Sequence, residues 1–578
     1  MDSSDESGSE FDGFTAHDLE LAQDRLDSLL ENASDIDLSD FEDDVDDSDD
    51  DIPLAALFRI RQNNADNGGA DEAEGPGEIM WIDQLTAKHV DDFVGNPGPV
   101  TILDKNKNEM DFFHLIFDET LYQKFADETN KYARAVQEKN GHDKKWYDTN
   151  SAEMRSYIAF HIIMGIVVAP NQDMYFTKDN LYRPTGINER ITRDRMDKLH
   201  QYFHVCDSSQ NPPKGQPGHD KLARVRPILE SVREKLKSQY RPHKETSIDE
   251  AMIAYTGRLG FKQYIPMKPT KRGIKVWMRA DPNNGFVNDF QVYTGRENNV
   301  AEKGLGERVV KDLTRDIWGQ NHHVYCDNYF TTVPLFEELL QNKTYACGTV
   351  RANRKGLPPA VVKAKLRKQG DMIQRQKGNL VATAWHDKRT VLLLTTNVDP
   401  TERTTVQRKQ KDGTIVEVPC PNAIRTYTQN MNGVDRADQP RSTYCINRKC
   451  TKWWKYLLWF IVDIAICSSF ILMKESPNHH LRTRTGRQKS RSQLEFRQKL
   501  SHQLLGTYQG KRKREVVPER QNLGVLHWPA DLGKKRTCKQ CSKNGLRKEP
   551  KTGCEQCGVN LCVPCFKPYH KDSFPELF

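Results

Sequence analysis

The end of the chain contains three CxxC pairs, and their spacing restricts the possible fold more than any other feature. The order is Cys538-x2-Cys541, twelve residues, Cys554-x2-Cys557, four residues, Cys562-x2-Cys565, then four residues and His570. Each CxxC pair can occupy one edge of a metal tetrahedron, which indicates zinc. A segment of about 45 residues has too small an apolar core to fold unaided. We therefore expect zinc to supply its folding free energy.

Two tetrahedral sites need eight ligands, and these pairs with His570 give seven. His527, in the run VLHWPAD, is the candidate for the eighth. The spacing resembles a cross-brace of the RING or PHD kind, which would hold two Zn²⁺ ions per chain. In that arrangement one ion is bound by Cys538, Cys541, Cys562 and Cys565, and the other by Cys554, Cys557, His570 and His527.

The charges are unevenly distributed along the chain. Residues 1–51 contain 21 acidic residues and one Arg, a net charge of −20, although the whole chain carries +6. The remaining 527 residues therefore carry +26. A basic body behind an acidic segment indicates a polyanion partner. The acidic segment either competes for the same surface or only aids solubility.

One stretch, Tyr456–Met473, imitates a membrane span. It is near the minimum spanning length, but Asp463 lies at its middle, and a charge there is costly in a bilayer. The N-terminus also lacks the pattern of a secretory signal. We therefore expect a buried helix of a large domain and no membrane partner.

Changes in composition and periodicity predict six regions. Residues 1–95 are predicted to be a disordered acidic region, and residues 96–245 and 446–510 the two parts of a helical domain. Residues 246–445 alternate strands and helices, with a β-rich insertion at about 350–425. A basic linker, 511–532, leads to the cysteine-rich domain, 533–578.

The middle region begins with a recognisable order of elements. TSIDEAMIAY is strand-like, and GIKVWMRADPNNGFVNDFQVYTG predicts a β-hairpin that turns at Pro282–Gly285. GERVVKDLTRDI predicts a helix, HVYCDNYF a buried strand and TTVPLFEELLQN a helix. Three strands, a helix, a strand and a helix resemble the opening of an RNase H-like α/β fold.

Four aspartates stand out by their setting. Asp249 lies within SIDEAM and Asp327 within VYCDNYF, while Asp435 and Asp438 lie three apart in GVDRADQ, on one helical face. A carboxylate within an apolar strand is costly unless it is paired or binds a metal. Carboxylates suit Mg²⁺, and a pair of such ions can drive phosphodiester cleavage. By this pattern alone, a metal site and a salt-bridged or turn-facing set remain open.

The longer motifs resemble those of piggyBac-family transposases, in the family's order. They are SIDEAM, YIPMKPTKRGIKVW, YCDNYFTT, CGTVRANRKGLP, WHDKR and MNGVDRADQ. The resemblance implies an RNase H-like catalytic core and a DDD active site in which Asp249, Asp327 and Asp435 bind two Mg²⁺ ions. Asp438 is implied as a fourth acidic residue. Pro440 departs from the family pattern and predicts an end or kink in the helix there.

The resemblance also implies an activity. Cut-and-paste transposases of this family excise a DNA transposon and integrate it at TTAA sites, by two-metal hydrolysis and transesterification through hairpin ends. The implied partner is double-stranded DNA, both the terminal repeats and the TTAA target. The implied assembly is a homodimer that holds two transposon ends together. The helical domain of residues 96–245 and 446–510 is implied to serve dimerisation and DNA binding.

Basic residues near the aspartates are predicted to contact DNA phosphates, although a solvated basic surface is the common alternative. The first group follows the strand end at Thr349, the second flanks the hairpin, and Arg258 is a weaker candidate. The groups are Arg351, Arg354 and Lys355, then Lys268, Lys271, Arg272 and Lys275. The cluster Lys511–Arg514 predicts a nuclear localisation signal or a further DNA contact.

Two other functions remain as alternatives. The chain could be a domesticated, transposase-derived DNA-binding protein without catalytic activity, although an idle site is free to lose its four aspartates. It could also be a ubiquitin ligase or chromatin reader built on the zinc frame. The basic surroundings of the cysteines and the long nuclease-like body favour the transposase.

Overall fold

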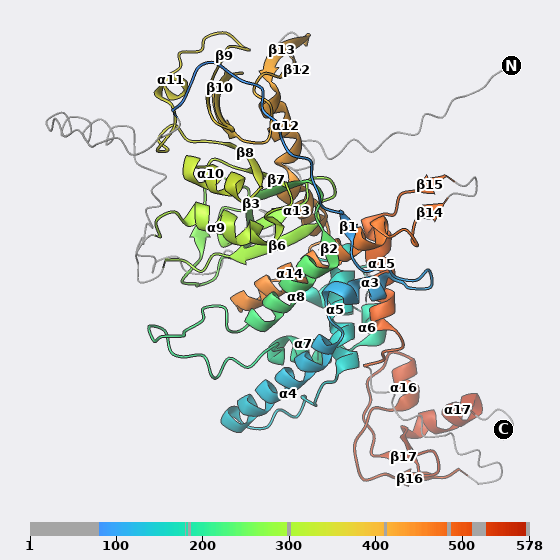
Figure 1. Ribbon diagram of the computed structural model, residues 1–578. Helices are drawn as coiled ribbons and strands as arrows, with labels where there is room; N and C mark the ends of the chain where they lie inside the picture. The colour runs from blue at the N-terminus through green and yellow to red at the C-terminus, as the bar shows by residue number, and fades with distance from the viewer. Residues whose placement is uncertain are drawn as a thin grey trace, which may run out of the picture. The chain divides into compact units, whose positions relative to one another are not determined.

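The computed structural model describes residues 80–177, 179, 181–182, 186–266, 268–296, 302–409, 413–482, 487–510 and 527–573. The chain divides into two compact units, Met1–Gly510 and Lys511–Phe578 (Figure 1). The predicted disordered region is described only from residue 80. The basic cluster Lys511–Arg514 lies outside the described residues.

A nine-stranded mixed sheet lies at the centre of the first unit (Figure 1). Its order is β4-β5-β3-β7-β8-β11-β10-β9, and β6 also pairs with β5. The pairs β3–β7 and β7–β8 are parallel, and the other pairs are antiparallel. The strands are β3 (Glu245–Ala254), β4 (Gln263–Tyr264), β5 (Arg272–Ala280), β6 (Val287–Val292), β7 (His323–Cys326), β8 (Tyr345–Thr349), β9 (Met372–Lys377), β10 (Leu380–His386) and β11 (Thr390–Thr395).

The predicted hairpin is confirmed as β5 and β6. Its turn is closed by the backbone N–H of Asp281, which donates to Phe286 O, and by that of Gly285, which donates to Asp281 O. Gly285 has a φ of +80°, a left-handed conformation that glycine adopts without steric cost.

Helices predicted after the hairpin cover one face of this sheet. They are α9 (Leu305–Thr314), the 3-10 turn η2 (Arg315–Ile317) and α10 (Val333–Gln341). Val309, Val310 and Leu313 of α9 pack in one apolar cluster with Ile248 of β3 and Trp277 of β5. Thr332 begins α10 because its hydroxyl accepts from the backbone N–H of Leu335.

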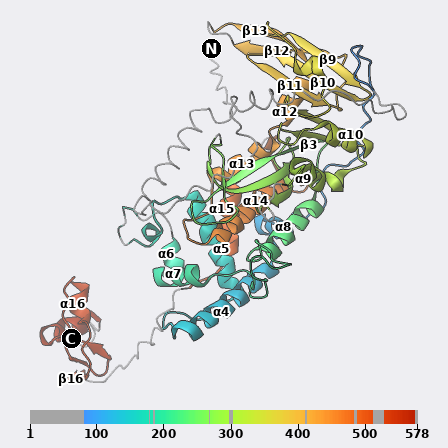
Figure 2. The same ribbon diagram turned by 90° about the vertical axis from the view of Figure 1, so that its left-hand side faces the viewer.

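The predicted insertion forms strands that continue the same sheet. After α11 (Pro359–Val362), strands β9 to β11 follow, and β11 pairs with β8 in antiparallel fashion. A separate hairpin, β12 (Arg403–Lys409) with β13 (Ile415–Pro421), leads into α12 (Asn422–Asn430) and α13 (Gly433–Thr443). Figure 2 shows α13 beside β3.

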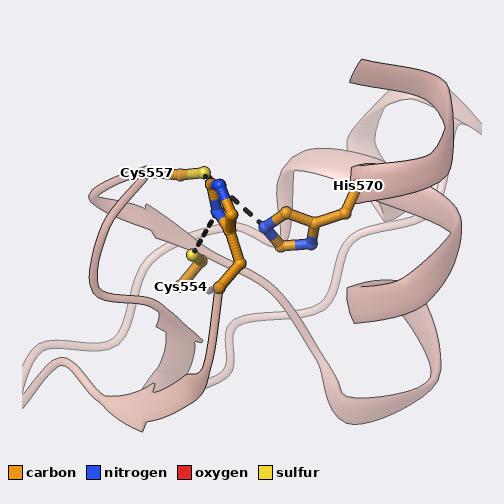
Figure 3. A group of neighbouring side chains, drawn as sticks. Cys554, Cys557 and His570 are labelled. Atoms are coloured by element: carbon orange, nitrogen blue, oxygen red, sulfur yellow. Dashed lines mark hydrogen bonds between the residues drawn. The ribbon is translucent and has the colours of Figure 1, made fainter. Parts of the chain in front are cut away.

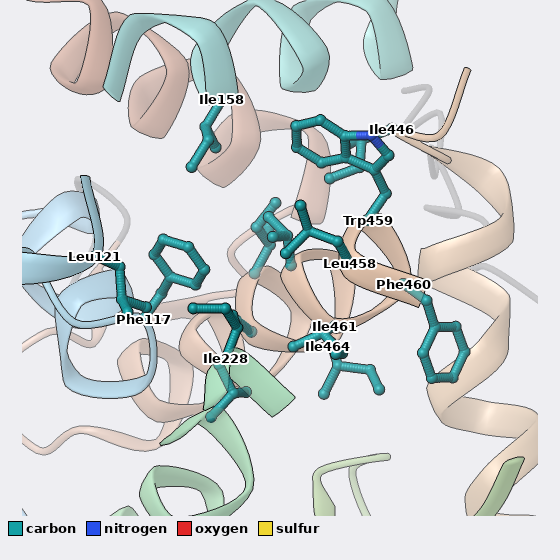
Figure 4. Close-up of a cluster of buried hydrophobic side chains, with 14 of the residues drawn as sticks. Phe117, Leu121, Ile158, Ile228, Ile446, Leu458, Trp459, Phe460, Ile461 and Ile464 are labelled. Atoms are coloured by element: carbon teal, nitrogen blue, oxygen red, sulfur yellow. The ribbon is translucent and has the colours of Figure 1, made fainter. Parts of the chain in front are cut away.

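The helical part of the first unit is built around α14 (Trp453–Glu475), and its apolar cluster also includes residues of the sheet. Figure 4 shows Leu458 and Ile461 of α14 among side chains of other elements, such as Ile158 and Ile228. The other helices and short strands of this unit are β1 (Gly98–Pro99), α3 (Glu109–Ile116), α4 (Thr120–Asn140), α5 (Ser151–Ile166), η1 (Gln172–Phe176), α6 (Ile187–Arg190), α7 (Arg193–Tyr202), α8 (Arg226–Gln239), β2 (Tyr240–Arg241), β14 (Leu481–Arg482), β15 (Gln488–Lys489) and α15 (Gln493–Leu505).

Among the described residues, α14 is the one helix long and apolar enough to cross a membrane, and 89% of its most apolar window is buried within the protein. Asp463 is buried and accepts a hydrogen bond from Arg497 Nη1 at 3.0 Å and one from the backbone N–H of Ile446 at 3.2 Å. The charge that made a membrane span costly is therefore paired inside the protein, and the expectation of a buried core helix is confirmed.

The second unit is small. Its elements are β16 (Pro529–Asp531), α16 (Lys539–Lys543), β17 (Thr552–Cys554), β18 (Val559–Asn560) and α17 (Val563–Ser573), and the strands form one antiparallel sheet. The fully buried members of its core cluster are three cysteines, Leu561 and Tyr569. The apolar core of the unit is therefore small.

Candidate active site and metal centres

The parallel pairing of β3 and β7 brings two of the predicted aspartates to neighbouring positions. Ile248 of β3 is the partner of Cys326, the last residue of β7. Asp249 and Asp327 are the next residues of each segment, and residues that follow paired positions in parallel strands remain neighbours. Asp249 lies within β3 as predicted, whereas Asp327 begins the loop after β7 and is not inside a strand. Both side chains are half-buried.

Asp327 is oriented by the end of the next strand. Thr349, the last residue of β8, donates its hydroxyl to Asp327 Oδ1 at 2.9 Å. Tyr427 of α12 lies on the same hydroxyl, with 3.5 Å between the two oxygens. Thr349 therefore fixes one oxygen of the carboxylate. Among the described residues, no side chain forms a hydrogen bond with the other oxygen.

Two of the arginines predicted to contact DNA instead hold the loop after Asp327. Arg354 Nη2 donates to the backbone carbonyls of Asn328 at 3.2 Å and Tyr329 at 2.6 Å. Arg351 Nε donates to Asn328 Oδ1 at 3.0 Å. These contacts position the loop that carries Asp327. Whether the same side chains also reach DNA stays a prediction.

The third and fourth aspartates lie on α13, which is seated tightly against the sheet. A Cβ at Gly433 would lie 2.3 Å from Ser247 Oγ of β3 and 2.8 Å from Ala280 O of β5, so a larger residue would push the helix away. Asp435, two residues later, is exposed. Asp438 is half-buried and pairs with Arg441 at 2.9 Å.

Pro440 neither ends α13 nor prevents its last turn, because the helix continues to Thr443. The predicted end of the helix at this residue is therefore wrong. Pro440 lacks the N–H that would bond the carbonyl of Arg436, and the helix nevertheless runs through Asp435 and Asp438.

The electrostatics link three of these residues. Burial raises the pKa of Asp249 to about 6, the ammonium of Lys268 counteracts this, and the charge of Asp435 adds to it. Asp435 is exposed at the surface, but the protein around its carboxyl still displaces part of the water and raises its pKa; the charge of Asp438 adds to this shift, and Lys268 opposes it. Lys268 therefore acts on both carboxylates, and the site has an excess of negative charge that a cation would relieve.

The carboxylates are not packed as ligands of one shared ion. Among the described residues, groups of at least three His, Cys, Asp or Glu whose ligand atoms all lie within 4.8 Å occur twice, and both groups lie in the second unit. Asp249, Asp327 and Asp435 are therefore more widely spaced. Two ions about 3.5–4 Å apart, each bound by one or two carboxylates, would suit that spacing.

The other basic residues predicted to contact DNA have different surroundings. Lys275 is half-buried and forms an ion pair with Glu250 at 2.5 Å, so the carboxylate of Glu250 partly neutralises its charge. Arg272 lies over the ring of Tyr264 at 4.9 Å. The fully exposed members of the set are Arg258, Lys271, Arg272 and Lys355.

In the second unit, the structure brings together the two ligand sets that the cross-brace spacing predicts. The first set is Cys538, Cys541, Cys562 and Cys565. The sulfur atom of Cys541 lies 3.6 Å from that of Cys562 and 3.5 Å from that of Cys565. A tetrahedron with Zn–S bonds of about 2.3 Å has edges of about 3.8 Å, so these separations fit one zinc ion.

The second set is His527, Cys554, Cys557 and His570 (Figure 3). His527 Nδ1 lies 3.4 Å from Cys554 Sγ and 3.2 Å from Cys557 Sγ, and His570 Nε2 lies 3.6 Å from Cys557 Sγ. The other nitrogen of His570 contacts Phe566 O at 2.7 Å, which orients the ring and leaves Nε2 to face the sulfurs. The donor set suits zinc.

The comparisons with known proteins decide the family. The sequence model described as "Transposase IS4" matches residues 108–470, more than half of the chain.

The chain belongs to this transposase family.

Two human relatives are similar to it over most of its length. The transposase is 26% identical over 444 residues to "PiggyBac transposable element-derived protein 5" of Homo sapiens, which covers 74% of this chain and 81% of the relative. It is 28% identical over 441 residues to "PiggyBac transposable element-derived protein 3" of Homo sapiens, with 73% and 70% covered. The resemblance to piggyBac-family transposases that the motifs indicated is confirmed.

A solved structure agrees. The transposase matches a chain of the "piggyBac transposase synaptic complex with hairpin DNA" with a TM-score of 0.63 and 26% identity, over 82% of this chain and 100% of that one. A mixed sheet with surrounding helices is therefore shared with a piggyBac transposase, and DNA is supported as the partner.

Sequence analysis of this transposase missed the residues that orient the site. Thr349 and Tyr427 carry no charge, and neither stands out by spacing. The one available signal was position, because Thr349 ends the strand that follows the Asp327 segment. Gly433 was also missed, although a glycine directly before an acidic helix often marks a close backbone approach.

Proposed function

We propose that this transposase is catalytically active and moves a DNA transposon by a cut-and-paste reaction. In this proposal it excises the element and integrates it at TTAA sites, by phosphodiester hydrolysis and transesterification through hairpin ends. The observation that carries the proposal is the register of β3 and β7, which makes Asp249 and Asp327 neighbours, with α13 seated against the same strand. The similar solved structure is a piggyBac transposase synaptic complex with hairpin DNA, which supports the hairpin route.

The strand order supports an RNase H-like core for the enzyme. Strands β6, β5 and β3 are antiparallel, and β7 and β8 continue from β3 in parallel. That is the order the sequence pattern predicted, with α9 between the hairpin and β7 and α10 between β7 and β8. Asp249 lies within the central strand β3, Asp327 directly follows β7, and Asp435 lies on α13, which packs against β3.

Asp249, Asp327 and Asp435 would hold two Mg²⁺ ions per active site. Such ions activate an attacking oxygen and stabilise the leaving one. The residues of the chain keep the carboxylates in place: Thr349 bonds Asp327, and Gly433 lets α13 approach β3 closely. Lys268, which acts on both Asp249 and Asp435, is placed to contact a DNA phosphate beside them.

Asp438 takes the fourth acidic position in this proposal. Its ion pair with Arg441 fixes the side chain and balances part of its charge. It therefore contributes through the local charge and the placement of α13.

The second unit would bind DNA as a module with two Zn²⁺ ions. Seven basic residues around its metal-ligand sets are exposed, which supports contact with a polyanion. They are Lys534, Lys535, Arg536, Lys539, Lys543, Arg547 and Lys548. We further propose a homodimer that holds two transposon ends, and a nuclear location directed by the Lys511–Arg514 cluster.

A non-catalytic, transposase-derived DNA-binding protein is the second candidate. The observation that favours it is that both human relatives are named as proteins derived from transposable elements. Four aspartates that remain in the family's positions favour the active enzyme instead, because an idle site does not need them.

An excision assay separates these two functions. The purified full-length protein is given a transposon with matched ends and Mg²⁺, and strand cleavage and DNA affinity are both measured. We expect Asp327→Asn to abolish cleavage and to leave DNA affinity unchanged, since the substitution removes a metal ligand and keeps the shape. Asp387→Asn, which removes a carboxylate paired with Arg408 elsewhere in the sheet, is the matched control and should cleave normally. Cleavage by Asp327→Asn at the wild-type rate, or no cleavage by any protein on authentic ends, would contradict the proposal.

A further inference from the structure

The first unit contains a cavity of about 160 Å³ on the face of the sheet opposite to Asp249. Asp249 of β3 is the partner of Met278 of β5, and side chains of successive residues in a strand point to opposite faces. Arg279, the next residue, therefore points away from the aspartates. The cavity is lined by Phe93, Lys237, Arg241, Arg279, Asn288 and His322, among others.

Arg279 lines this cavity with two donors that have no partner. Its side chain is 1% exposed, and Nη2 donates to Asp316 at 2.7 Å. Its Nε and Nη1 are buried without a hydrogen-bond partner. Leaving buried donors of a charged group unpaired costs more than for neutral donors, typically above about 1–3 kcal/mol each. The cost is recovered if a ligand supplies acceptors in the cavity.

Asn288 lines the same cavity, and neither atom of its amide has a partner. The side chain is buried. The pairing of β5 with β6 shifts here: Arg279 pairs with Asp289 and Ala280 with Val287, so Asn288 is an extra residue. Such a β-bulge redirects a side chain, and bulges are common beside binding sites.

The charges around the cavity favour an anion. Arg279 is balanced by Asp316, and the buried Asp289 is bound by both Arg233 and Lys237. Arg241, on the rim, is exposed and forms no ion pair among the described residues. Of the residues that line the cavity, Lys237, Arg241 and Arg279 are cationic and Asp316 is acidic, so the lining keeps an excess of positive charge.

We propose that this cavity binds a hydrogen phosphate group, either free inorganic phosphate or a phosphate monoester. After a small shift of their buried side chains toward the cavity, Arg279 and the Asn288 amide nitrogen would donate to its oxygens, while Lys237 and Arg241 supply charge. The Asn288 amide oxygen also needs a donor, and a hydrogen phosphate has an O–H group to offer. A DNA phosphodiester and sulfate have none. The volume exceeds the about 10–15 Å³ that one water occupies by this measure, so the cavity has room for more than solvent bridging.

The inference goes beyond the proposed transposition and does not depend on it. Arg279 and Asn288 are separated from the aspartates by the sheet, so the cavity could bind phosphate in an active or an inactive transposase. Phosphate bound there would tie β5 and β6 to η2 and to the segment at Phe93.

Thermal unfolding of the full-length, zinc-loaded protein tests the proposal. The melting temperature Tm of the first unit is measured in sodium phosphate, sodium sulfate and sodium chloride at matched ionic strength. Binding to the folded state alone should raise Tm saturably, by about 2 °C at high occupancy, and sulfate should raise it less. Asn288→Leu fills the position with an apolar side chain of similar size and should remove the phosphate-specific rise.

Two further variants keep the test decisive if Asn288→Leu does not fold. Arg241→Gln changes an exposed rim residue and should weaken the phosphate response several-fold in concentration. Arg408→Gln also replaces an arginine by glutamine. Arg408 pairs with Asp387 and does not line the cavity, so this variant should keep the wild-type response to phosphate. These controls separate binding from the general stabilising effect of phosphate salts.

The proposal is overturned if phosphate and chloride give the same Tm, or if Asn288→Leu and wild type respond equally. DNA affinity is measured on the same variants. If inorganic phosphate has no effect but Asn288→Leu weakens DNA binding relative to Arg408→Gln, a backbone phosphodiester occupies the cavity and the monoester proposal is wrong.

Discussion

The two metal-ligand arrangements of this chain are built in opposite ways. In the second unit, thiolates and imidazoles form two closed sets whose ligand atoms all lie within 4.8 Å. In the first unit, Asp249, Asp327 and Asp435 are spaced more widely, and Asp435 is exposed. A closed set of four ligands is typical of a structural metal site, whereas a catalytic site keeps positions open. The difference supports two uses of metal in our proposal: zinc for folding in the second unit and Mg²⁺ for chemistry in the first.

The apolar cores differ in the same direction. The first unit buries a large cluster around α14 and the sheet, so its fold needs no ion. The second unit buries little apart from its cysteines, Leu561 and Tyr569. We therefore expect metal binding to take the place of a large core in the second unit and not in the first. The predictions below try to break this contrast, from the largest expected effect to the smallest.

Removal of zinc should unfold the second unit and spare the first. Zinc binding in small modules contributes about 10–16 kcal/mol, more than such a small core can replace. We expect 1,10-phenanthroline to abolish amide-exchange protection in β17 and α17 of the full-length protein, while α14 stays protected. The non-chelating isomer 1,7-phenanthroline is the control. Protection of α17 that survives the loss of zinc would break the contrast.

A core truncation should have the reverse effect. Ile461, fully buried in α14, loses packing in Ile461→Ala, which should cost the first unit about 2–5 kcal/mol. Denaturant unfolding followed by tryptophan fluorescence would measure this, since Trp454 and Trp459 lie in the same cluster. Ile415→Ala, at a side chain that is 66% exposed, should change little. An equal loss of zinc affinity in Ile461→Ala would show that the two units are not independent.

Thr349→Val sharpens the comparison at the carboxylate site. The variant keeps the shape of the side chain but loses the hydrogen bond to Asp327 Oδ1. Because residues behind metal ligands typically contribute 10–100-fold, cleavage should fall by about that factor if the proposed activity holds. The Tm should stay nearly unchanged, and Thr390→Val at an exposed position in β11 should cleave normally. Undiminished cleavage by Thr349→Val would remove its positioning role.

Acidification should lower the free energy of unfolding of the first unit, because several of its histidines are buried. Burial lowers the pKa of His200 to about 3 and that of His204 to about 4, and it also lowers the pKa of His161. The unfolded chain then binds more protons than the folded one below the ordinary pKa of about 6.5, so stability is present above that pH and falls as the pH drops. We expect a loss of about 2 kcal/mol per histidine between pH 7 and pH 5, because an unfolded imidazole with a pKa of about 6.5 takes up its proton over that range.

Calorimetry across that range measures the effect, with zinc in excess. The second unit should also lose stability, because protons compete with zinc for its ligands, but added zinc should restore only that unit. A first-unit Tm that is constant from pH 7 to pH 5 would contradict the assignment of these histidines as neutral in the folded state.

Much of this organisation could be predicted from local sequence. The CxxC spacing gave the two sets of metal ligands, and alternation with turn residues gave the β5–β6 hairpin, because both patterns act over short distances. The buried helix α14 could be predicted because Asp463 is incompatible with a bilayer centre. Its partner Arg497, far along the chain, could not.

Other features depend on long-range packing, which periodicity does not report. The continuation of the sheet through β11, the bond from Thr349 to Asp327 and the use of Arg354 on the Asp327 loop all join distant segments. The unpaired amide of Asn288 lies at a bulge between two strands. The family motifs marked the aspartates, but they gave no information about these supporting contacts.

The central claim is that Asp249, Asp327 and Asp435 meet around divalent ions, and iron-mediated cleavage of the protein tests it most directly. Fe²⁺ replaces Mg²⁺ in the zinc-loaded protein with transposon-end DNA, and ascorbate with peroxide generates hydroxyl radicals at the bound ion. The account predicts backbone cuts near residues 249, 327 and 435 together, all suppressed by excess Mg²⁺ and by Asp327→Asn. Cuts at only one of these segments, or a pattern unchanged in Asp327→Asn, would contradict it.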